Sequence, residues 1–403
     1  MIDPEVYRVL VYGVLVAWLT PIFYVCLAII GSILHKKKQI SCGKRTPELL
    51  IFQIPTIGNV KIVNKIMNTI KEHDLPTKVQ TWVIIEEANK HKEEYDADKV
   101  VVVPKGFECE ALYKGRALEY ARQERLKLVE QGELSLNYVV AQSDDDATLS
   151  QGFMKECCTI DADIMIGFIS PRLDKVGLMC KILDYERCVS AVVPDLFFTN
   201  INAPIYSHGE GLCISSRVDR AVNYKVSEVN PNLKKGIKLI ASEDLFYTHK
   251  TSGMGFNSYC SREPIYVLPP MNIRDAIIQR NRWLWGHINA IKHGFLFKRN
   301  AIRVVLYELL GLITYPLAMI GIPLSLFGFF RFTPELQLLT TFTLFLWLGL
   351  RFYSITYIKG WKDGLYGMLF SYFTVTLSFF VRIYGLLKGD SKEFKVIQKE
   401  KLT

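Results

Sequence analysis

The hydrophobic positions of this 403-residue chain follow two different patterns. Residues 9–34, 304–330, 336–357 and 365–387 form long, nearly continuous apolar runs, whereas residues from about 46 to 275 alternate short apolar runs with amphipathic stretches. A helix that crosses a bilayer needs about 20 apolar residues, and each long run provides that length. The pattern predicts an α-helical transmembrane bundle of about four spans attached to one folded domain.

The central region has the pattern of an α/β domain. β-rich runs are expected as strands, and stretches with helical periodicity are expected between them. Open α/β sheets bind their ligands where the strands end, so we expect a nucleotide there. The expected strands are 49–54, 79–85, 100–103 and 138–142, and the expected helices are 60–70 and 112–130.

A further segment, residues 272–303, mixes apolar and aromatic side chains with several Arg and Lys, as interfacial amphipathic helices do. The predicted organisation therefore has five parts. These are an N-terminal transmembrane helix (1–35), the α/β domain (36–271), the interfacial helices (272–303), three transmembrane helices (304–388) and a C-terminal tail (389–403).

The basic residues predict an orientation. His35 and three lysines follow the first apolar run, which by the positive-inside rule places the α/β domain on the cytoplasmic face of an integral membrane protein. Four spans would leave the tail on the opposite side, although residues 388–403 carry five Lys against three acids. The alternative is that one apolar run lies in the membrane interface.

Composition supports this organisation. A hydrophobic content of 50% is too high for a purely soluble enzyme, and 22% charged residues exclude a protein made only of membrane helices. The net charge of +9 suits anionic lipid headgroups and phosphate-bearing substrates. Basic stretches interleaved with aromatics are missing, so nucleic acid is not an expected partner. The nine cysteines include no C-x-x-C pair and are expected as reduced thiols.

Three polar clusters carry the candidate chemistry. The first, Asp144, Asp145 and Asp146, directly follows the last expected strand. Carboxylates at its first and third positions would point together and suit Mg²⁺ or Mn²⁺ bridging to a nucleotide diphosphate. The structural alternative is a solvated turn or a helix N-cap.

The second cluster, Glu243 and Asp244, precedes an amphipathic stretch. A carboxylate at such a position can act as general base on an acceptor hydroxyl. The alternative is helix capping by Ser242, with the two acids favoured by the helix dipole.

The third cluster comprises Gln279, Arg280, Asn281, Arg282 and Trp283. Guanidinium groups can bind a departing diphosphate, and an indole face can stack on a sugar ring. The alternative is a membrane-surface helix whose arginines meet lipid phosphates and whose tryptophans form an aromatic belt.

The ordered set D-x-D, E-D and Q-x-x-R-W before membrane helices resembles the membrane-integrated, inverting family 2 glycosyltransferases, which include cellulose, chitin and hyaluronan synthases. The match covers about residues 46–300, and residues 102–105 and 111–120 look most like egghead-type β-1,4-mannosyltransferases. The resemblance implies a GT-A fold, a nucleotide-sugar-binding domain of Rossmann-like type, for the α/β region.

The resemblance also assigns roles to individual residues. It implies Asp244 as catalytic base and Asp146 as the ligand of Mg²⁺ or Mn²⁺. The family usually has Asp where this chain has Glu86 and Glu87. The implied nucleotide-binding residues are Thr56, Glu87, Lys114 (or Arg116), Asp144, Arg280 and Arg282, and the implied acceptor-binding residues are Gly209, Glu210, Gln279 and Trp283.

The expected function is an inverting transfer of a sugar, by resemblance mannose from GDP-mannose, to a glycan or lipid-linked acceptor in a β-1,4 linkage. One alternative is a processive synthase that uses UDP-glucose or UDP-N-acetylglucosamine. Another is a non-catalytic membrane scaffold that binds nucleotide sugars. A transporter is disfavoured, because the acidic clusters lie outside the apolar runs.

Overall fold

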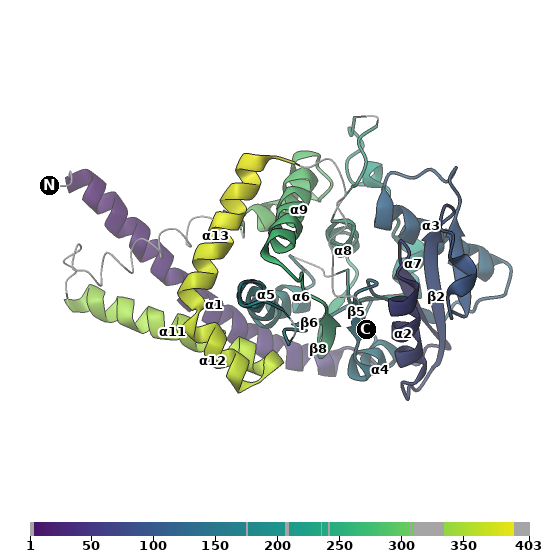
Figure 1. The fold of residues 1–403 in the computed structure, drawn as a ribbon, viewed down its shortest axis with the longest axis horizontal. Coiled ribbons are helices and arrows are strands. Elements are labelled where there is room, and N and C mark those ends of the chain that lie inside the picture. Colours follow the sequence, from purple (N-terminus) through teal and green to yellow (C-terminus); the bar gives the residue numbers. More distant parts are fainter. Residues whose placement is uncertain are drawn as a thin grey trace.

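The computed structural model describes residues 4–174, 176–205, 209–234, 236–240, 242–306, 308–309 and 334–390. Figure 1 shows a sheet with its covering helices at one end and long helices at the other. Shorter helices, among them α5 (Leu178–Ser190) and α6 (Leu196–Asn200), lie between the two ends.

One eight-stranded mixed sheet organises the α/β part. Its strand order is β3-β2-β1-β4-β7-β6-β8-β5. The first four are parallel, β7 runs antiparallel to both β4 and β6, β8 is parallel to β6, and β5 is antiparallel to β8. The strands are β1 (Leu49–Pro55), β2 (Lys78–Glu86), β3 (Lys99–Val103), β4 (Tyr138–Gln142), β5 (Ala147–Leu149), β6 (Ile164–Pro171), β7 (Leu212–Ser215) and β8 (Ser258–Val267).

The parallel half confirms the expected strands and helices within a few residues. Helix α2 (Val60–Lys71) connects β1 to β2, and α3 (Tyr113–Glu130) connects β3 to β4. Because β1 to β4 are parallel, their carboxyl ends lie at one edge of the sheet.

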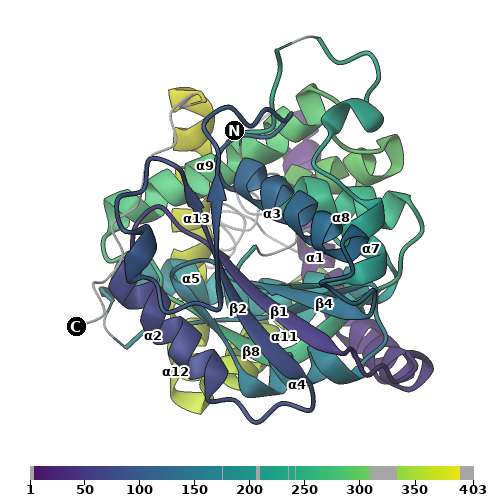
Figure 2. The same cartoon turned by 90° about the vertical axis from the view of Figure 1, so that its right-hand side faces the viewer.

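Two apolar layers cover the two faces of the sheet. Alternate residues of β1 point to opposite faces, so Leu49 and Ile51 pack under α3, whereas Leu50 and Phe52 pack under α2. The first layer also holds α7 (Ser216–Ala221) and α8 (Glu243–Gly253), and the second holds α4 (Gln151–Thr159). Figure 2 shows α3, α7 and α8 on one side of the strands and α2 and α4 on the other.

A helical segment joins the sheet to the long helices. It consists of α5 (Leu178–Ser190), a π-helical turn η2 (Ala191–Asp195) and α6 (Leu196–Asn200). Helix α9 (Ile273–Lys292) packs against α5, and its N-terminus is capped by Asn272, whose side chain accepts from Asp275 N at 2.9 Å. The predicted interfacial segment 272–303 therefore begins with one long helix.

The long helices are α1 (Pro4–Ser41), α11 (Pro334–Lys359), α12 (Trp361–Leu369) and α13 (Ser371–Lys388). Two of them contain stretches long and apolar enough to cross a membrane, namely Leu19–Ser41 and Gln337–Lys359. The pair α12 and α13 meets the same test jointly, but the two helices are bent by 66° at their junction. The described residues thus hold two candidate spans, or three if the bent pair forms one.

Two of the expected apolar runs differ in outline from the helices that the structure describes. The run 365–387 was expected as one span, and it forms two helices, α12 and α13, which meet at Phe370 and make one span only if the bent pair crosses together. The first helix was expected to end near residue 35, but α1 continues to Ser41 because its last turns pack on the α/β part, where the His35 and Tyr259 rings lie 5.3 Å apart. The predicted span 304–330 lies mostly outside the described residues.

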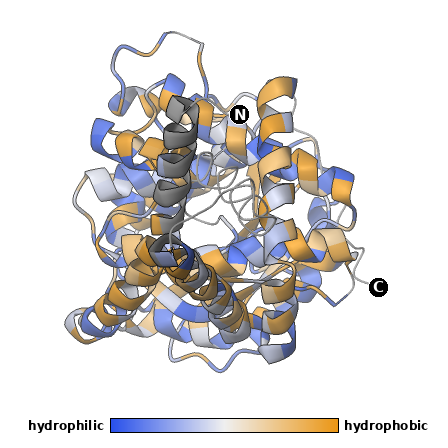
Figure 3. Cartoon of the chain, turned by 90° about the vertical axis from the view of Figure 1, so that its left-hand side faces the viewer, coloured by the Kyte–Doolittle hydropathy of each residue, from blue (hydrophilic) through white to orange (hydrophobic). Residues whose placement is uncertain are grey.

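The long helices expose many large apolar side chains. Figure 3 faces this end of the molecule, and much of the coloured ribbon of these helices has the hydrophobic colour. Clustered exposed apolar side chains on a folded protein mark a surface that interacts with a partner or a membrane. The exposed residues include Phe23, Ile29 and Ile33 of α1, Leu338, Phe342 and Phe345 of α11, and Phe373, Phe380 and Leu387 of α13.

Candidate functional site

Polar side chains follow the four parallel strands at their common edge. Thr56 follows β1, Glu87 follows β2, Lys105 follows β3 and Asp144 follows β4 shortly after its end. The backbone N–H of Lys105 donates to Glu87 Oε2 at 2.7 Å, which ties the ends of β2 and β3 together. The edge therefore presents Thr56 and Glu87, the two predicted base and ribose contacts, on adjacent strands.

The acidic triplet forms a tight turn between β4 and β5. The Asp144 carbonyl accepts from Ala147 N at 3.2 Å, and the chain then continues as a strand, so the alternative of a helix N-cap is wrong. Asp145 Oδ2 accepts from Thr56 Oγ1 at 2.8 Å and from Asn59 Nδ2 at 2.9 Å. This middle carboxylate fixes the turn against the end of β1.

Lys114, in the first turn of α3, is the centre of the acidic site. Its Nζ forms an ion pair with Asp144 Oδ1 and lies 3.5 Å from Glu243 Oε1. Burial disfavours the Lys114 ammonium, but the carboxylates of Asp144, Glu243 and Asp244 outweigh it and raise the Lys114 pKa. The first and second acidic clusters, about 100 residues apart in the chain, are thus joined by one lysine.

Asp244 lies in the first turn of α8. Its Oδ1 accepts from Leu245 N at 2.8 Å and its Oδ2 accepts from Gly209 N at 3.0 Å. Burial, followed by the nearby Glu243 carboxylate, raises the pKa of Asp244 to about 6. Asp244 is therefore mainly ionised at neutral pH yet basic enough to accept a proton.

The residue before this helix has an unusual backbone. Ser242 has φ of 61°, in the left-handed region, and its side chain makes no capping hydrogen bond. A non-glycine residue in that region costs about 1–2 kcal/mol. The alternative interpretation of Ser242 as a conventional N-cap is wrong. The strained turn at Ser242 instead fixes the start of α8 and with it the positions of Glu243 and Asp244.

The Gly209–Glu210 loop connects this site to the third cluster. Glu210 Oε1 forms a buried ion pair with Arg187 Nη2 at 2.9 Å. The Arg187 guanidinium lies 5.5 Å from the centre of the Trp283 ring, within cation–π range. Asp244, Gly209, Glu210, Arg187 and Trp283 therefore form one continuous set of contacts from α8 to α9.

One arginine of the third cluster, Arg280, pairs with an acid of a neighbouring helix. Arg280 Nη2 pairs with Asp184 of α5 at 2.8 Å, and its guanidinium lies 5.1 Å from the Trp283 ring centre. Arg282 is two residues further along α9, and helix positions i and i+2 do not face each other. Gln279, also on α9, is 3% exposed.

Sequence reasoning missed two contributors, Arg187 and Asp184. Both belong to α5, a stretch that carried no recognised motif. The available signal was an arginine with acids at 184 and 186 in a largely apolar helical run. Buried charges are paired or functional, so charged residues in such an apolar run indicate a buried ion pair or a site.

The carboxylates at the edge of the sheet are the candidate ligands for a cation. Among the described residues, no three His, Cys, Asp or Glu side chains are grouped as a ready-made metal site. Asp144 and Asp146 nevertheless supply oxygen ligands of the kind Mg²⁺ and Mn²⁺ take, and such ions are commonly held by one or two carboxylates together with substrate phosphates. The donor set therefore fits a cation that arrives with a diphosphate.

The fold is a GT-A-like α/β fold with a mixed sheet, as the resemblance implied. A family model described as "Glycosyl transferase family group 2" matches residues 139–382, and the chain belongs to that family. This match spans β4, the acidic triplet, Asp244, α9 and most of the long helices.

The chain is also similar to several solved structures. The mannosyltransferase PcManGT from Pyrobaculum calidifontis, in complex with GDP-Man and Mn²⁺, aligns with a TM-score of 0.51 at 12% identity, covering 94% of this chain and 100% of that one. Glucosyl-3-phosphoglycerate synthase from Mycobacterium tuberculosis gives 0.34 at 11% identity, with 63% and 80% covered. Mannosyl-3-phosphoglycerate synthase from Rubrobacter xylanophilus gives 0.35 at 11%, with 64% and 77% covered. Comparison with curated proteins gave no match.

Proposed function

We propose that this glycosyltransferase family 2 protein is an inverting β-1,4-mannosyltransferase that moves mannose from GDP-mannose to a hydroxyl of a glycan or lipid-linked acceptor. The observation that carries the proposal is the convergence of Lys114, Asp144 and Asp244 at the carboxyl edge of the sheet. The site joins a cationic group suited to a diphosphate with a carboxylate basic enough to act on a hydroxyl.

In the proposed reaction, Asp244 takes the proton of the acceptor hydroxyl as that oxygen attacks the anomeric carbon. A new carbon–oxygen bond forms on one face of the sugar, and the bond to the diphosphate breaks on the other. The diphosphate leaves with the bonding electron pair, and the Lys114 ammonium next to Asp144 stabilises its charge. An α-linked donor then gives a β-linked product.

Asp144 and Asp146 would hold Mg²⁺ or Mn²⁺ when the donor is bound. Such an ion supplies positive charge to the departing diphosphate. Lys114 already pairs with Asp144, so its ammonium must share that carboxylate or turn toward the phosphate oxygens when donor enters.

The proposed acceptor side lies beyond Asp244, where Gly209, Glu210 and Trp283 follow one another. An indole face beside a carboxylate offers stacking and hydrogen bonding to a sugar ring, and Arg187 keeps the two in place. Gln279 belongs to the same helix as Trp283, and its buried Oε1 has no hydrogen-bond partner among the described residues. This arrangement supports acceptor binding between α9 and the loop at Gly209.

The test is a donor screen with the full chain purified in detergent. GDP-mannose, UDP-glucose and UDP-N-acetylglucosamine are each incubated with octyl β-D-glucoside as acceptor, with Mn²⁺ or with EDTA, and released nucleotide and glycoside products are measured. We expect GDP release and a single added mannose that require the divalent ion. Release of UDP with long products would support the processive alternative.

A substitution of Asp244 tests its proposed role as general base. Asp244→Asn keeps the size of the side chain and its acceptor oxygen but removes the basic carboxylate, so turnover should fall about 10²- to 10⁴-fold while donor affinity changes little. Lys225→Gln on an exposed loop is a matched control for loss of one charge. Nucleotide binding without turnover in the wild-type chain would favour the non-catalytic scaffold.

A further inference from the structure

We infer that a buried chain of hydrogen bonds through Gln53 and Gln142 positions Asp244 by holding the peptide of Gly209. The two glutamines are positioning residues, because they act on Asp244 through the Gly209 backbone and do not touch the reacting groups. This inference rests on the proposed role of Asp244 as base.

The peptide units of the Gly209–Glu210 loop are held from two sides. On one side the N–H of Gly209 donates to Asp244 Oδ2 at 3.0 Å. On the other side Gln142 Nε2 donates to the Gly209 carbonyl at 3.4 Å, and Ser143 Oγ, whose nearest acceptor is the Ala147 carbonyl at 3.0 Å, lies 3.4 Å from the Glu210 carbonyl. The end of β4, just before the acidic triplet, therefore fixes the loop that meets the base.

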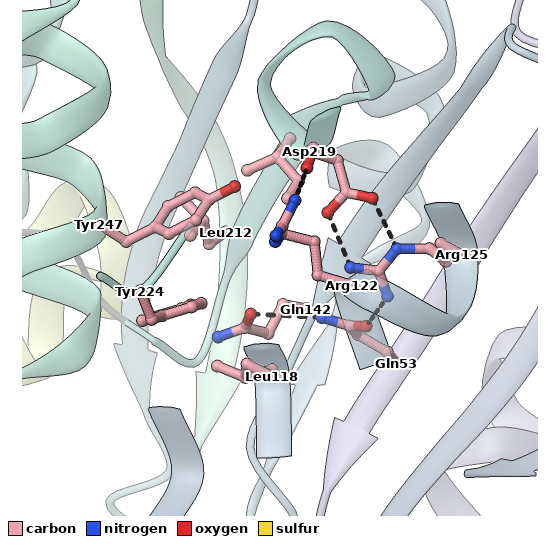
Figure 4. A pocket seen from close by; sticks show the side chains of 10 residues that line it. Gln53, Leu118, Arg122, Arg125, Gln142, Leu212, Asp219, Tyr224 and Tyr247 are labelled. Carbon is pink, nitrogen blue, oxygen red and sulfur yellow. Dashed lines mark hydrogen bonds and ion pairs between the residues drawn. The ribbon is translucent and has the colours of Figure 1, made fainter. Parts of the chain in front are cut away.

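The chain of hydrogen bonds continues deeper into the protein, where Figure 4 shows Gln142, Gln53, Arg125 and Asp219 around a small cavity. Gln53 Nε2 donates to Gln142 Oε1 at 3.4 Å, and Gln53 Oε1 accepts from Arg125 Nη1 at 2.7 Å. Arg125 is itself fixed by two hydrogen bonds of 2.7 Å to the Asp219 carboxylate. The loop is thus connected to a buried ion pair between α3 and α7.

The direction of every link is forced by its two ends. Arginine can only donate, so Gln53 must present its oxygen to Arg125 and its amide N–H to Gln142. Gln142 must then present its own N–H to the Gly209 carbonyl, which can only accept. A flip of either amide would place like groups against each other, so the chain specifies one arrangement.

Burial gives the chain its stiffness. Gln53 is 2% exposed and Gln142 is 4% exposed, so water cannot readily replace a lost partner. A buried polar group left without its partner is disfavoured, which keeps both amides in place. The hydrogen bonds of 3.4 Å are long, so they contribute more to the orientation of the two amide groups than to the stability of the protein.

This geometry has a consequence for the chemistry of Asp244. A backbone N–H that donates to a carboxylate favours its charged form, so loss of the Gly209 bond would raise the pKa of Asp244. Among the residues that the structure describes, the other charged or titratable groups that face Asp244 are Glu243, Lys114, Glu210 and Tyr224. None of these is altered by a substitution at Gln142.

The experiment compares Gln142→Met with Tyr138→Phe in the full chain. Methionine matches the length of glutamine but cannot donate to Gly209, whereas Tyr138→Phe removes a 2.8 Å hydrogen bond to Asp219 in the same buried network and leaves the two glutamines paired. Initial rates are measured with GDP-mannose, Mn²⁺ and octyl β-D-glucoside between pH 5 and 8.

For Gln142→Met we expect kcat to fall about 10- to 100-fold, as misplaced catalytic groups do, with an unchanged KM for GDP-mannose. The acid limb of its pH profile should move to higher pH. Tyr138→Phe should keep the wild-type kcat and profile. Equal losses in both variants, or an unmoved acid limb in Gln142→Met, would overturn the inference.

Two further variants separate this inference from the proposed function. If Gln142→Met does not fold, Gln53→Met breaks the chain one link earlier and should shift the acid limb in the same direction. If Asp244→Asn is inactive while both glutamine variants are wild-type, the inference is wrong and the proposed function stands. If Asp244→Asn retains wild-type turnover, the role of Asp244 as base is wrong, and the inference that rests on it fails with it.

Discussion

At the scale of single residues, the site depends on one partly buried base and one partly buried cation. Asp244 and Lys114 lie on different helices, and each changes the protonation of the other. Burial alone would favour a neutral carboxyl at Asp244, while Lys114 opposes that effect. The balance places the pKa of Asp244 where a general base is effective near neutral pH.

A pH profile tests this balance. Burial and Glu243 raise the pKa of Asp244 to about 6, and only the ionised carboxylate can accept a proton. The value of kcat/KM should therefore be constant above about pH 7 and fall about tenfold per unit below about pH 6. Initial rates at a donor concentration well below KM measure it, and a constant rate down to pH 4.5 would exclude Asp244 as the base.

A substitution at Gly209 tests how closely Lys114 and Asp244 approach this backbone position. A Cβ at this position would lie 2.3 Å from Lys114 Nζ and 3.4 Å from Asp244 Oδ2. Gly209→Ala should displace the Lys114 side chain from Asp144 and reduce kcat/KM about 10-fold or more, at little cost to folding. Gly106→Ala, with open space around the new Cβ, is the control. Equal kinetics for both variants would contradict this geometry.

At the scale of elements, α5 connects the α/β part to the helical end. Its face toward the site carries Arg187 and Asp184, which pair with Glu210 and Arg280. Its Glu186 pairs with Arg351 of α11 at 2.6 Å, and Lys181 pairs with Asp363 of α12 at 2.7 Å. One helix therefore joins the candidate acceptor side to the long helices.

The buried pair Arg187–Glu210 can be tested by a double-mutant cycle. Arg187→Met removes the buried cation that pairs with the Glu210 carboxylate, which should lower the free energy of unfolding by about 3–5 kcal/mol. Adding Glu210→Met removes the buried negative charge as well and should recover part of that loss. Thermal unfolding midpoints in detergent measure both effects, and a double variant as unstable as the sum of the singles would show that the pair is not coupled.

At the scale of the whole molecule, apolar surface is concentrated at the end away from the sheet. Two helices there contain stretches able to cross a bilayer, and a bent pair forms a third candidate. The basic residues at the end of α1 support an orientation with the α/β part in the cytoplasm, which we propose for this protein. The site would then face the cytoplasmic surface of the membrane.

Membrane integration predicts a fractionation result. After expression of the full chain, alkaline carbonate should leave the protein in the membrane pellet, because transmembrane helices are not released by loss of surface charge. A cysteine-reactive, membrane-impermeant label applied to intact cells should not reach Cys109, which lies in the α/β part and is partly exposed. Release by carbonate, or labelling of Cys109 from outside, would contradict the proposed arrangement.

The sequence by itself determined the four parallel strands, the helices between them and the presence of long apolar helices, because local periodicity reports which positions are buried. The ordered motifs also pointed to Asp144 and Asp244, and the family resemblance pointed to Lys114 or Arg116. Arg187 did not, because a buried arginine becomes meaningful only when Glu210 and Trp283 are brought beside it.

Only the tertiary structure decided how far α1 extends and where the chain bends before α13. Both depend on packing partners that lie far away in the sequence, such as Tyr259 for the end of α1. The same is true of the hydrogen-bond chain from Arg125 to Gly209, since glutamines within strands have no local pattern that reveals their partners. Chain order sets which residues can form an element, but three-dimensional packing sets which side chains meet.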